Sequence, residues 1–283
     1  MAVQLVPLPE IERLSPACIR ILGGNPGKFT LQGTNTYLVG TGSKRLLIDT
    51  GEGKPSWIAA VKRTLDEEKA TISGTIITHW HGDHTGGIKN VLESWPGTKI
   101  YKNRPEQGQL EIADGQVFEV EGASLTAVHT PGHTVDHMVL VLKEEDAMFT
   151  GDNVLGHGTA VFEDLGVYLD SLEKMKGLFK GRAYPGHGPA VPDGPAKIAE
   201  YIGHRRQREE QVIQTLRTER PGTGDRSAWS AMELVKVIYR DIPESLHEPA
   251  ARGVLLILRK LQKEGKVVAA DGDRWRLSDR SAL

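Results

Sequence analysis

His79-Trp80-His81-Gly82-Asp83-His84 is the stretch of this 283-residue sequence that decides its fold. Three histidines and an aspartate, all side chains that bind divalent metals such as zinc, fall within these six residues. The apolar run at 72–78 predicts a buried strand, and the glycine and polar residues after it predict a turn. Two imidazoles one residue apart can face one ion on extended backbone. We expect Asp83 and His84 to face a second ion near the start of a helix over residues 85–93. A polar surface turn is the alternative.

Three further ligand-type residues follow at comparable places in the chain. They are His133 in Thr130-Pro-Gly-His133, Asp152 in Met148-Phe-Thr-Gly-Asp152 and His187 in Ala183-Tyr-Pro-Gly-His187. Each stands at the end of a strand-like apolar run, beside a glycine that lets the backbone turn sharply. Strand ends that meet at one edge of a sheet can build one pocket. The expected arrangement has His79, His81 and His133 at one ion, Asp83, His84 and His187 at the other, and Asp152 bridging the two.

A site with two metal ions would activate water for hydrolysis. Asp83, besides being a ligand, is placed to take a proton from that water. Zinc is the expected metal because nitrogen and oxygen ligands suit it, with manganese or iron as alternatives. The ligand set does not choose between carbonyl and phosphorus, so thioester, ester and phosphodiester substrates all stay open.

This set of motifs resembles the metallo-β-lactamase superfamily over residues 21–187, including Leu46-Leu-Ile-Asp49-Thr-Gly. The resemblance implies an α/β fold, the αββα sandwich, with two sheets face to face, helices outside and metals at one edge. Asp49 is expected to support a metal histidine by accepting its N–H, and a cap for the turn at Thr50-Gly51 is the alternative. The best-known β-lactamases have cysteine at the place of Asp152. An aspartate there indicates the glyoxalase II, thioesterase and nuclease branches.

Longer segments narrow the resemblance to one branch of the superfamily: Asn25-Pro-Gly-Lys-Phe-Thr-Leu-Gln-Gly-Thr-Asn-Thr-Tyr-Leu-Val-Gly40, residues 151–165 and residues 184–189. This branch contains fungal polyketide acyl-carrier-protein thioesterases, of the atrochrysone carboxyl ACP thioesterase type, and an animal mitochondrial lactamase-like endoribonuclease. Gly156-His157-Gly favours the thioesterases, because the animal enzyme has an acidic residue where His157 stands. The resemblance implies release of a polyketide, in secondary metabolism, from its acyl carrier protein by thioester hydrolysis. Cleavage of single-stranded RNA is the alternative.

Five other residues carry separate expectations. His157, in a glycine-rich loop five residues after Asp152, either reaches the substrate or faces water. Asn35 is expected to fix a turn, and donation of hydrogen bonds near the site is the alternative. Asp136-His137 is expected to support a metal ligand or to begin a helix. Cys18 is the single cysteine; we expect it in the core, and one cysteine cannot form an intramolecular disulfide.

The composition is that of a globular enzyme, with 39% hydrophobic and 25% charged residues. No run of eighteen apolar residues occurs, so no membrane span is expected. The first twenty residues include Glu10 and Glu12 and lack the apolar core of a secretory signal. We therefore expect a cytoplasmic protein.

Two domains are expected, a catalytic domain at 1–202 and a helical linker with a winged-helix-like module at 203–283. The second region holds 16 Lys and Arg against 12 Asp and Glu, a net charge of +4, whereas the first has a net charge of −6. Apolar spacing predicts a helix over 248–264, and Gly265–Leu277 predicts a hairpin that turns at Asp271-Gly272. A basic surface of this kind can bind the phosphates of RNA or of a phosphopantetheine-bearing carrier, or can simply be solvated.

Overall fold

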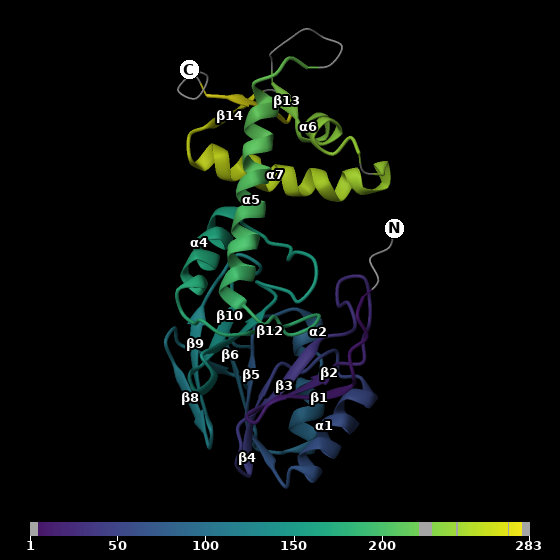
Figure 1. Ribbon diagram of the computed structural model, residues 1–283, viewed down its shortest axis with the longest axis vertical. Coiled ribbons are helices and arrows are strands. Elements are labelled where there is room, and N and C mark those ends of the chain that lie inside the picture. The colour runs from purple at the N-terminus through teal and green to yellow at the C-terminus, as the bar shows by residue number, and fades with distance from the viewer. Residues whose placement is uncertain (1–4, 221–227, 242, 271, 279–283) are drawn as a thin grey trace. The chain divides into compact units, whose positions relative to one another are not determined.

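The computed structural model describes residues 5–220, 228–241, 243–270 and 272–278 (Figure 1). The chain divides into two compact units: Met1–Phe162 with Asp170–Ala199, and Glu163–Leu169 with Glu200–Leu283. The first unit contains the expected metal site, and the second contains the expected winged helix. The domain boundary expected between residues 202 and 203 stays a prediction, which limited proteolysis would test.

Seven strands form the first sheet, and their order in the sheet is their order in the chain. The sheet is antiparallel from β1 to β4 and parallel from β4 to β7. The strands are β1 (Ile11–Ser15), β2 (Cys18–Leu22), β3 (Asn35–Val39), β4 (Lys44–Ile48), β5 (Thr71–Ile77), β6 (Lys99–Lys102) and β7 (Leu110–Glu111). Parallel neighbours need a crossover connection. The helix α1 (Pro55–Glu67) supplies it between β4 and β5, and α2 (Gly82–Thr85) and α3 (Ile88–Ser94) supply it between β5 and β6. Residues 103–109 join β6 to β7 without a helix.

Five strands form the second sheet, in the order β12-β11-β10-β9-β8. They are β8 (Val117–Val120), β9 (Ala123–His129), β10 (Met138–Leu142), β11 (Ala147–Gly151) and β12 (Ala183–Pro185). Only the β11–β12 pair is parallel, and the helix α4 (Leu165–Lys176) lies between these two strands in the chain. The strands predicted before His133, Asp152 and His187 are β9, β11 and β12, so these predictions are confirmed.

The space between the two sheets is filled by side chains from both of them. Tyr37 of β3 meets Phe149 of β11 with ring centroids 5.0 Å apart, and Phe149 meets Tyr184 of β12 at 5.0 Å. The Tyr37 hydroxyl donates to the carbonyl of Pro185 at 2.6 Å, which satisfies the polar end of a buried ring. Cys18 is fully buried in this core, as expected.

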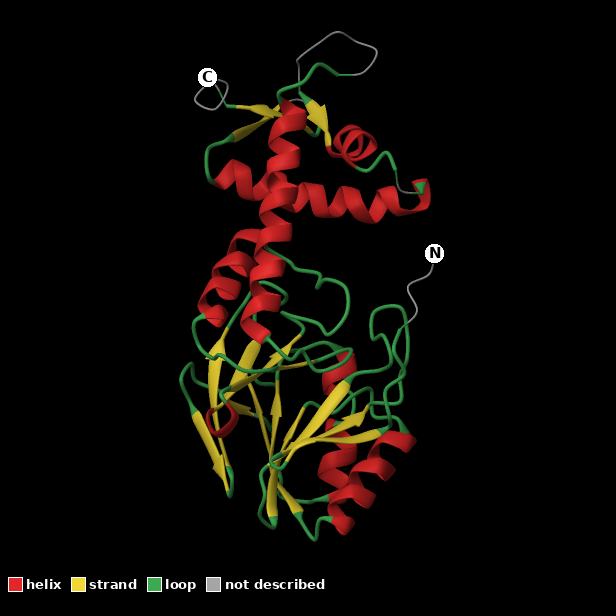
Figure 2. Cartoon of the chain, viewed as in Figure 1, coloured by secondary structure: helices red, strands yellow, loops and turns green. Residues whose placement is uncertain are grey.

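Helices lie along the outer face of the first sheet (Figure 2). A second apolar layer fills the space between these helices and the sheet. Leu47 of β4 belongs to this layer, whereas its neighbours Leu46 and Ile48 belong to the layer between the sheets. Strands covered on both faces have continuous apolar runs rather than alternation, which is why 46–48 reads Leu-Leu-Ile. Trp57 of α1 is fully buried here, and its indole N–H donates to Thr36 Oγ1 at 2.9 Å. The helices outside two facing sheets make the αββα sandwich predicted from the sequence.

The second unit includes a three-stranded sheet and two amphipathic helices. The elements that follow α5 (Gly194–Leu216) are β13 (Trp229–Ser230), α6 (Ala231–Ile238), α7 (His247–Lys263), β14 (Val267–Ala270) and β15 (Arg274–Leu277). Ser230 begins α6 with a capping box, in which its hydroxyl accepts from the Glu233 N–H at 3.2 Å and Glu233 accepts from the Ser230 N–H at 2.8 Å. The predicted hairpin is present as β14 and β15, although Asp271 of its turn lies outside the described residues.

The predicted apolar face of α7 is buried, as the spacing of Val254, Ile257, Leu258 and Leu261 indicates.

None of the helices in the described residues has the length and apolar character that a membrane span needs.

Candidate metal centre

His79, His81 and His133 face one another although the chain separates them by up to 54 residues. His79 directly follows Thr78 at the end of β5, and His133 stands in the loop between β9 and β10. His79 Nε2 lies 3.0 Å from His81 Nδ1, and His133 Nε2 lies 3.3 Å from the first nitrogen and 3.1 Å from the second. Nitrogens bound to one tetrahedral zinc ion at about 2.0–2.1 Å would be about 3.3 Å apart. The triangle therefore has the size of a three-histidine ligand set.

Asp83, His84 and His187 form a second group beside the first. Asp83 Oδ2 lies 3.2 Å from His187 Nε2 and 3.4 Å from His84 Nε2. Asp83 and His84 belong to α2, the single turn that begins directly after His81. His187 follows β12, where the chain turns through Gly186.

Asp152 lies between the two groups, as expected for a bridging carboxylate. Its Oδ1 is 3.5 Å from His84 Nε2, and its Oδ2 is 3.3 Å from His187 Nε2 and 3.7 Å from His133 Nε2. The structure thus brings together all seven side chains predicted as ligands.

Three buried atoms of this cluster have no hydrogen-bond partner among the described residues: His187 Nδ1, His84 Nε2 and Asp152 Oδ1. A buried polar atom without a partner costs about 1–3 kcal/mol. The last two atoms lie 3.5 Å apart, and a cation bound between them would remove that cost for both. Five imidazoles and two carboxylates are also a donor set that suits a divalent ion, so the residues present fit a metal centre.

Asp49 contacts the imidazole of His84 at Nδ1, the ring nitrogen that does not face the cluster. Its Oδ2 lies 2.8 Å from His84 Nδ1, and its two oxygens accept from the backbone N–H and the hydroxyl of Thr78, both at 2.8 Å. With Nδ1–H donated to Asp49, the Nε2 atom of His84 is directed to the cluster. Of the two roles considered for Asp49, support of a metal histidine is the one its contacts match.

His137 and Asn35 hold other parts of the cluster in place. The backbone N–H of Asp152 donates to His137 Nε2 at 3.1 Å, so His137 supports the bridging residue. The alternative that Asp136-His137 begins a helix is wrong, because β10 follows at Met138. Asn35 donates to the carbonyls of Pro185 and Gly188, both at 2.8 Å, and so holds the loop that carries His187. The expected role for Asn35 was to fix a turn, and the alternative, donation of hydrogen bonds near the site, is the one these contacts match.

The expected helix over 85–93 is divided in two, because α2 ends at Thr85 and α3 begins at Ile88. A Cβ atom on Gly87 would lie 2.2 Å from the Thr50 carbonyl oxygen, and one on Gly86 would lie 2.8 Å from Glu52. The two glycines let this segment pack against residues 50–52, and the helix is interrupted there.

A sequence profile described as "Metallo-beta-lactamase superfamily" matches residues 29–187, more than half of the chain. The chain belongs to the metallo-β-lactamase superfamily. A second profile, "Beta-lactamase associated winged helix domain", matches residues 230–275, which confirms the winged-helix prediction for the second unit of this superfamily member.

Curated relatives are similar over nearly the whole chain. One is the "Atrochrysone carboxyl ACP thioesterase" of Aspergillus chevalieri, 48% identical over 96% of this chain and 90% of that protein. Another is the "Atrochrysone carboxyl ACP thioesterase AgnL7" of Paecilomyces divaricatus, 46% identical over 93% of this chain and 85% of that protein. A solved beta-lactamase domain protein from Burkholderia ambifaria has the same fold, with a TM-score of 0.80 and 16% identity over 95% of this chain and 93% of that one.

The aspartates and histidines of this superfamily site shift the pKa values of one another. Burial acts to raise the pKa of Asp152, but His187 and His84 outweigh it and hold the pKa well below its ordinary value. Burial acts in the opposite direction on His187, yet Asp152 and Asp83 raise the pKa of His187 to about 9. Burial keeps the pKa of His79 well below its ordinary value. The cluster therefore has ionised carboxylates that favour a cation.

One contact that links distant segments at this site carries no local sequence signal. The Lys102 ammonium at the end of β6 pairs with Asp136 in a buried ion pair, and it also donates to the carbonyls of Asn103 and Arg104 at 2.9 and 3.1 Å. Asp136 in turn accepts from Thr134, the residue after His133, at 2.7 Å. This pair ties the His133 loop of the second sheet to the first sheet.

A cavity of about 340 Å³ opens directly over the cluster. Five of the seven predicted ligands reach it, and the rest of its wall comes from two loops, at 28–31 and 155–161. His157 lines this cavity, which favours the substrate-facing alternative considered for it.

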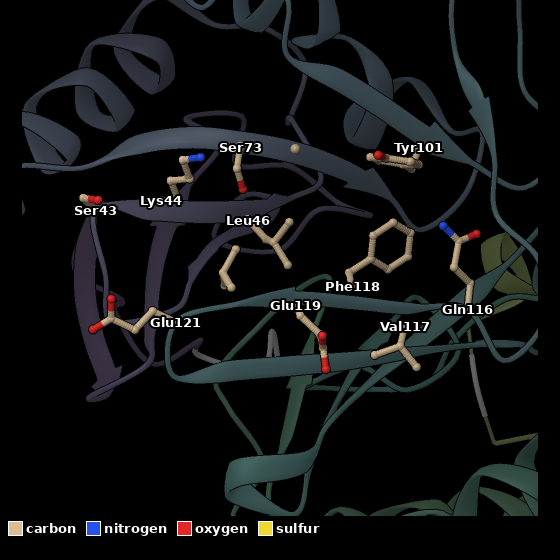
Figure 3. A pocket seen from close by; sticks show the side chains of 12 residues that line it. Ser43, Lys44, Leu46, Ser73, Tyr101, Gln116, Val117, Phe118, Glu119 and Glu121 are labelled. Atoms are coloured by element: carbon tan, nitrogen blue, oxygen red, sulfur yellow. The ribbon is translucent and has the colours of Figure 1, made fainter.

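A separate cavity of about 550 Å³ opens between β4 and β8 and contains no residue of the predicted ligand set (Figure 3). Leu46 and Phe118 point into it, with Lys44 and Glu121 at its rim.

Proposed function

We propose that this protein is a metal-dependent thioesterase that releases a polyketide acyl group from an acyl carrier protein. The observation that carries the proposal is the similarity, across nearly the whole chain, to relatives named atrochrysone carboxyl ACP thioesterases. The cluster of seven histidine and aspartate side chains and the cavity over it support a hydrolase, and the relatives' names supply the substrate class.

The seven clustered side chains are proposed as ligands of two divalent cations, with zinc expected. His79, His81 and His133 would hold one cation, Asp83, His84 and His187 the other, and Asp152 both. Divalent cations bound at such a site would lower the pKa of water and polarise a carbonyl group.

Asp83 is proposed as the carboxylate that takes the proton from the attacking water. It lines the cavity, and its Oδ2 accepts a hydrogen bond from Thr34 Oγ1 at 3.2 Å. Burial would raise the pKa of Asp83, but His187 and His84, whose Nε2 atoms lie 3.2 and 3.4 Å from its Oδ2, hold the pKa well below its usual range, so the side chain is ionised.

A thiol leaving group suits this site because it does not need a proton donor from the protein. Thiols have a pKa of about 8.5, so the thiolate departs without a dedicated acid. The polar lining of the cavity consists largely of proposed metal ligands, and none of them is needed as an acid under this scheme.

The alternative is cleavage of single-stranded RNA. The winged-helix match and the net charge of +4 on residues 203–283 favour this alternative, because a basic surface can bind the phosphates of RNA. The net charge of −6 on residues 1–202 opposes binding of a polyanion near the metal site.

A panel assay tests the proposal. Purified protein is given acyl-carrier-protein thioesters and single-stranded RNA, each with and without a chelator. We expect thioester hydrolysis that the chelator abolishes and that His81→Ala lowers by at least about 100-fold, since His81 is one of three ligands in its group. The matched control is His204→Ala, which removes a histidine of α5 outside the ligand set. RNA cleavage that needs His81, with no thioester turnover, would reverse the order of the two functions.

A further inference from the structure

Two exposed apolar side chains stand at the mouth of the metal cavity. Phe29 is 73% exposed and Val161 is 60% exposed, and both line the cavity over the cluster. They come from different loops, one between β2 and β3 and the other after β11. Single exposed apolar residues are ordinary on a protein surface, but two that line one cavity from separate loops can contact the same ligand.

The loop that carries Phe29 is held in shape by its own hydrogen bonds. The N–H of Gly27 donates to the Leu31 carbonyl at 3.1 Å, and Thr30 Oγ1 donates to the Asn25 carbonyl at 2.6 Å. At the base of the loop, Asn25 accepts from the Thr34 N–H at 2.9 Å and donates to its hydroxyl at 3.0 Å. The exposed ring is therefore presented at a defined place.

Each of the two loops also makes a hydrogen bond with a proposed metal ligand. Thr34, at the base of the first loop, donates to Asp83 at 3.2 Å. Val161, in the second loop, accepts through its backbone carbonyl a hydrogen bond from His133 Nδ1 at 2.8 Å. The positions of Phe29 and Val161 are thus set relative to the metal centre, as a substrate-positioning pair requires.

We propose that Phe29 and Val161 form an acyl-recognition pair that selects flat, aromatic acyl groups; this inference rests on the proposed thioesterase function. A phenyl ring stacks on other aromatic rings at centroid distances of 4.5–7 Å and gains more from them than from saturated groups of equal area. The Lys28 ammonium lies 5.6 Å from the centroid of the Phe29 ring, within cation–π distance. A cavity of about 340 Å³ has the size of a small-molecule site.

The test compares two thioesters with the same leaving group, N-acetylcysteamine, and the same carbon skeleton. The 2-naphthoyl thioester is flat, and the decahydro-2-naphthoyl thioester is its puckered, saturated counterpart. For Phe29→Ala we expect kcat/KM to fall about tenfold on the flat substrate, equivalent to about 1.4 kcal/mol, and about threefold or less on the saturated one. Phe29→Leu should restore turnover of the saturated substrate but not of the flat one.

Val161→Ala has a closely matched control in Val117→Ala. Val117 is 51% exposed and lies on β8 at the separate cavity between β4 and β8 (Figure 3). We expect about a threefold loss on the flat substrate for Val161→Ala and none for Val117→Ala. Metal content should stay at the wild-type value in all these variants, because none of the three side chains is a proposed ligand.

Binding to the metal-free protein separates recognition from chemistry. The probes are the two methylene ketones in which CH₂ replaces the thioester sulfur. We expect Phe29→Ala to raise the calorimetric Kd of the naphthyl ketone about tenfold. Equal losses on the flat and saturated compounds, or a Val161→Ala effect no larger than that of Val117→Ala, would overturn the recognition pair and leave the thioesterase proposal standing. Failure of the wild-type protein to hydrolyse either thioester would count against the thioesterase proposal itself.

Discussion

Asp49 Oδ2 lies 2.8 Å from His84 Nδ1 and makes the contact that orients this imidazole. Removing the carboxylate charge should weaken cation binding at the Asp83–His84–His187 group by about 10–100-fold. Asp49→Asn is the suitable change, because Asp49 has a positive φ of 58°, which asparagine also tolerates. Metal affinity measured by chelator competition checks this. The control is Asp66→Asn on the exposed side of α1, and an Asp49→Asn protein that binds two ions with unchanged affinity would contradict the role.

The lack of a side chain at Gly186 leaves room for the Asp152 carboxylate. A Cβ atom at this position would lie 2.2 Å from Asp152 Oδ1 and 3.0 Å from His84 Cε1. We expect Gly186→Ala to displace Asp152 and to lower metal affinity and thioester turnover by at least about tenfold, or about 1.4 kcal/mol.

The control for this change is Gly203→Ala in α5, where a Cβ atom would meet nothing within 4 Å. Alanine in a helix interior should stabilise the protein there by roughly 0.5–1 kcal/mol. Unchanged metal content and turnover in Gly186→Ala would show that the site relaxes around the methyl group.

Metal affinity should rise with pH. Burial alone would lower the pKa of His187, but Asp152 and Asp83 raise it to about 9, so this ring carries a proton at pH 7 when no cation is bound. Cation binding must displace that proton, which costs affinity below pH 9 and not above it. We expect affinity to increase by about tenfold per pH unit between pH 7 and 9 for each proton displaced, as chelator competition at several pH values would measure.

The same shift affects the stability of the metal-free protein with the opposite sign. A histidine whose folded pKa lies above its unfolded value stabilises the fold fully below about pH 6.5 and loses that contribution as the pH rises through about 9. Thermal unfolding with a chelator present should therefore show falling stability between pH 6.5 and 9. An affinity that is constant from pH 7 to 9 would contradict the protonated His187.

Lys102 and Asp136 form a buried ion pair that supports the His133 loop. Lys102→Met removes one partner and leaves a buried carboxylate unpaired, which should lower the free energy of unfolding by about 3–5 kcal/mol. The control is Lys89→Met, since Lys89 pairs with Glu93 on an exposed face of α3 at 3.8 Å, and such pairs contribute about 0–1 kcal/mol. Denaturant unfolding measures the free energy of unfolding of the two variants. Equal losses of this free energy would contradict the supporting role of the buried ion pair.

The candidate site could be predicted from the sequence because its residues follow strands. A short apolar run, a glycine and a histidine or aspartate recur at Thr130–His133, Met148–Asp152 and Ala183–His187, and strand ends gather at one sheet edge. The structure has these strands, and it brings the predicted residues together. The two-sheet fold followed from the same motifs through their resemblance to the superfamily.

What the sequence did not predict depends on contacts between distant segments. Lys102 and Asp136 are 34 residues apart, and Thr34 and Asp83 are 49 residues apart. Neither pair belongs to a periodic pattern or a motif, so only the packing of the two sheets and their loops shows that these residues meet. The break of the helix at Gly86-Gly87 has the same origin, since it depends on the approach of residues 50–52.

Metal titration of thioester turnover tests the central claim most directly. Metal-free protein is titrated with Zn²⁺ while thiol release from an acyl-carrier-protein thioester is followed. The seven-residue cluster with its bridging Asp152 predicts that the rate rises to a plateau at two equivalents of metal per chain. A thioester hydrolysis rate that is the same with and without metal, or no hydrolysis at any metal concentration, would contradict a dinuclear thioesterase.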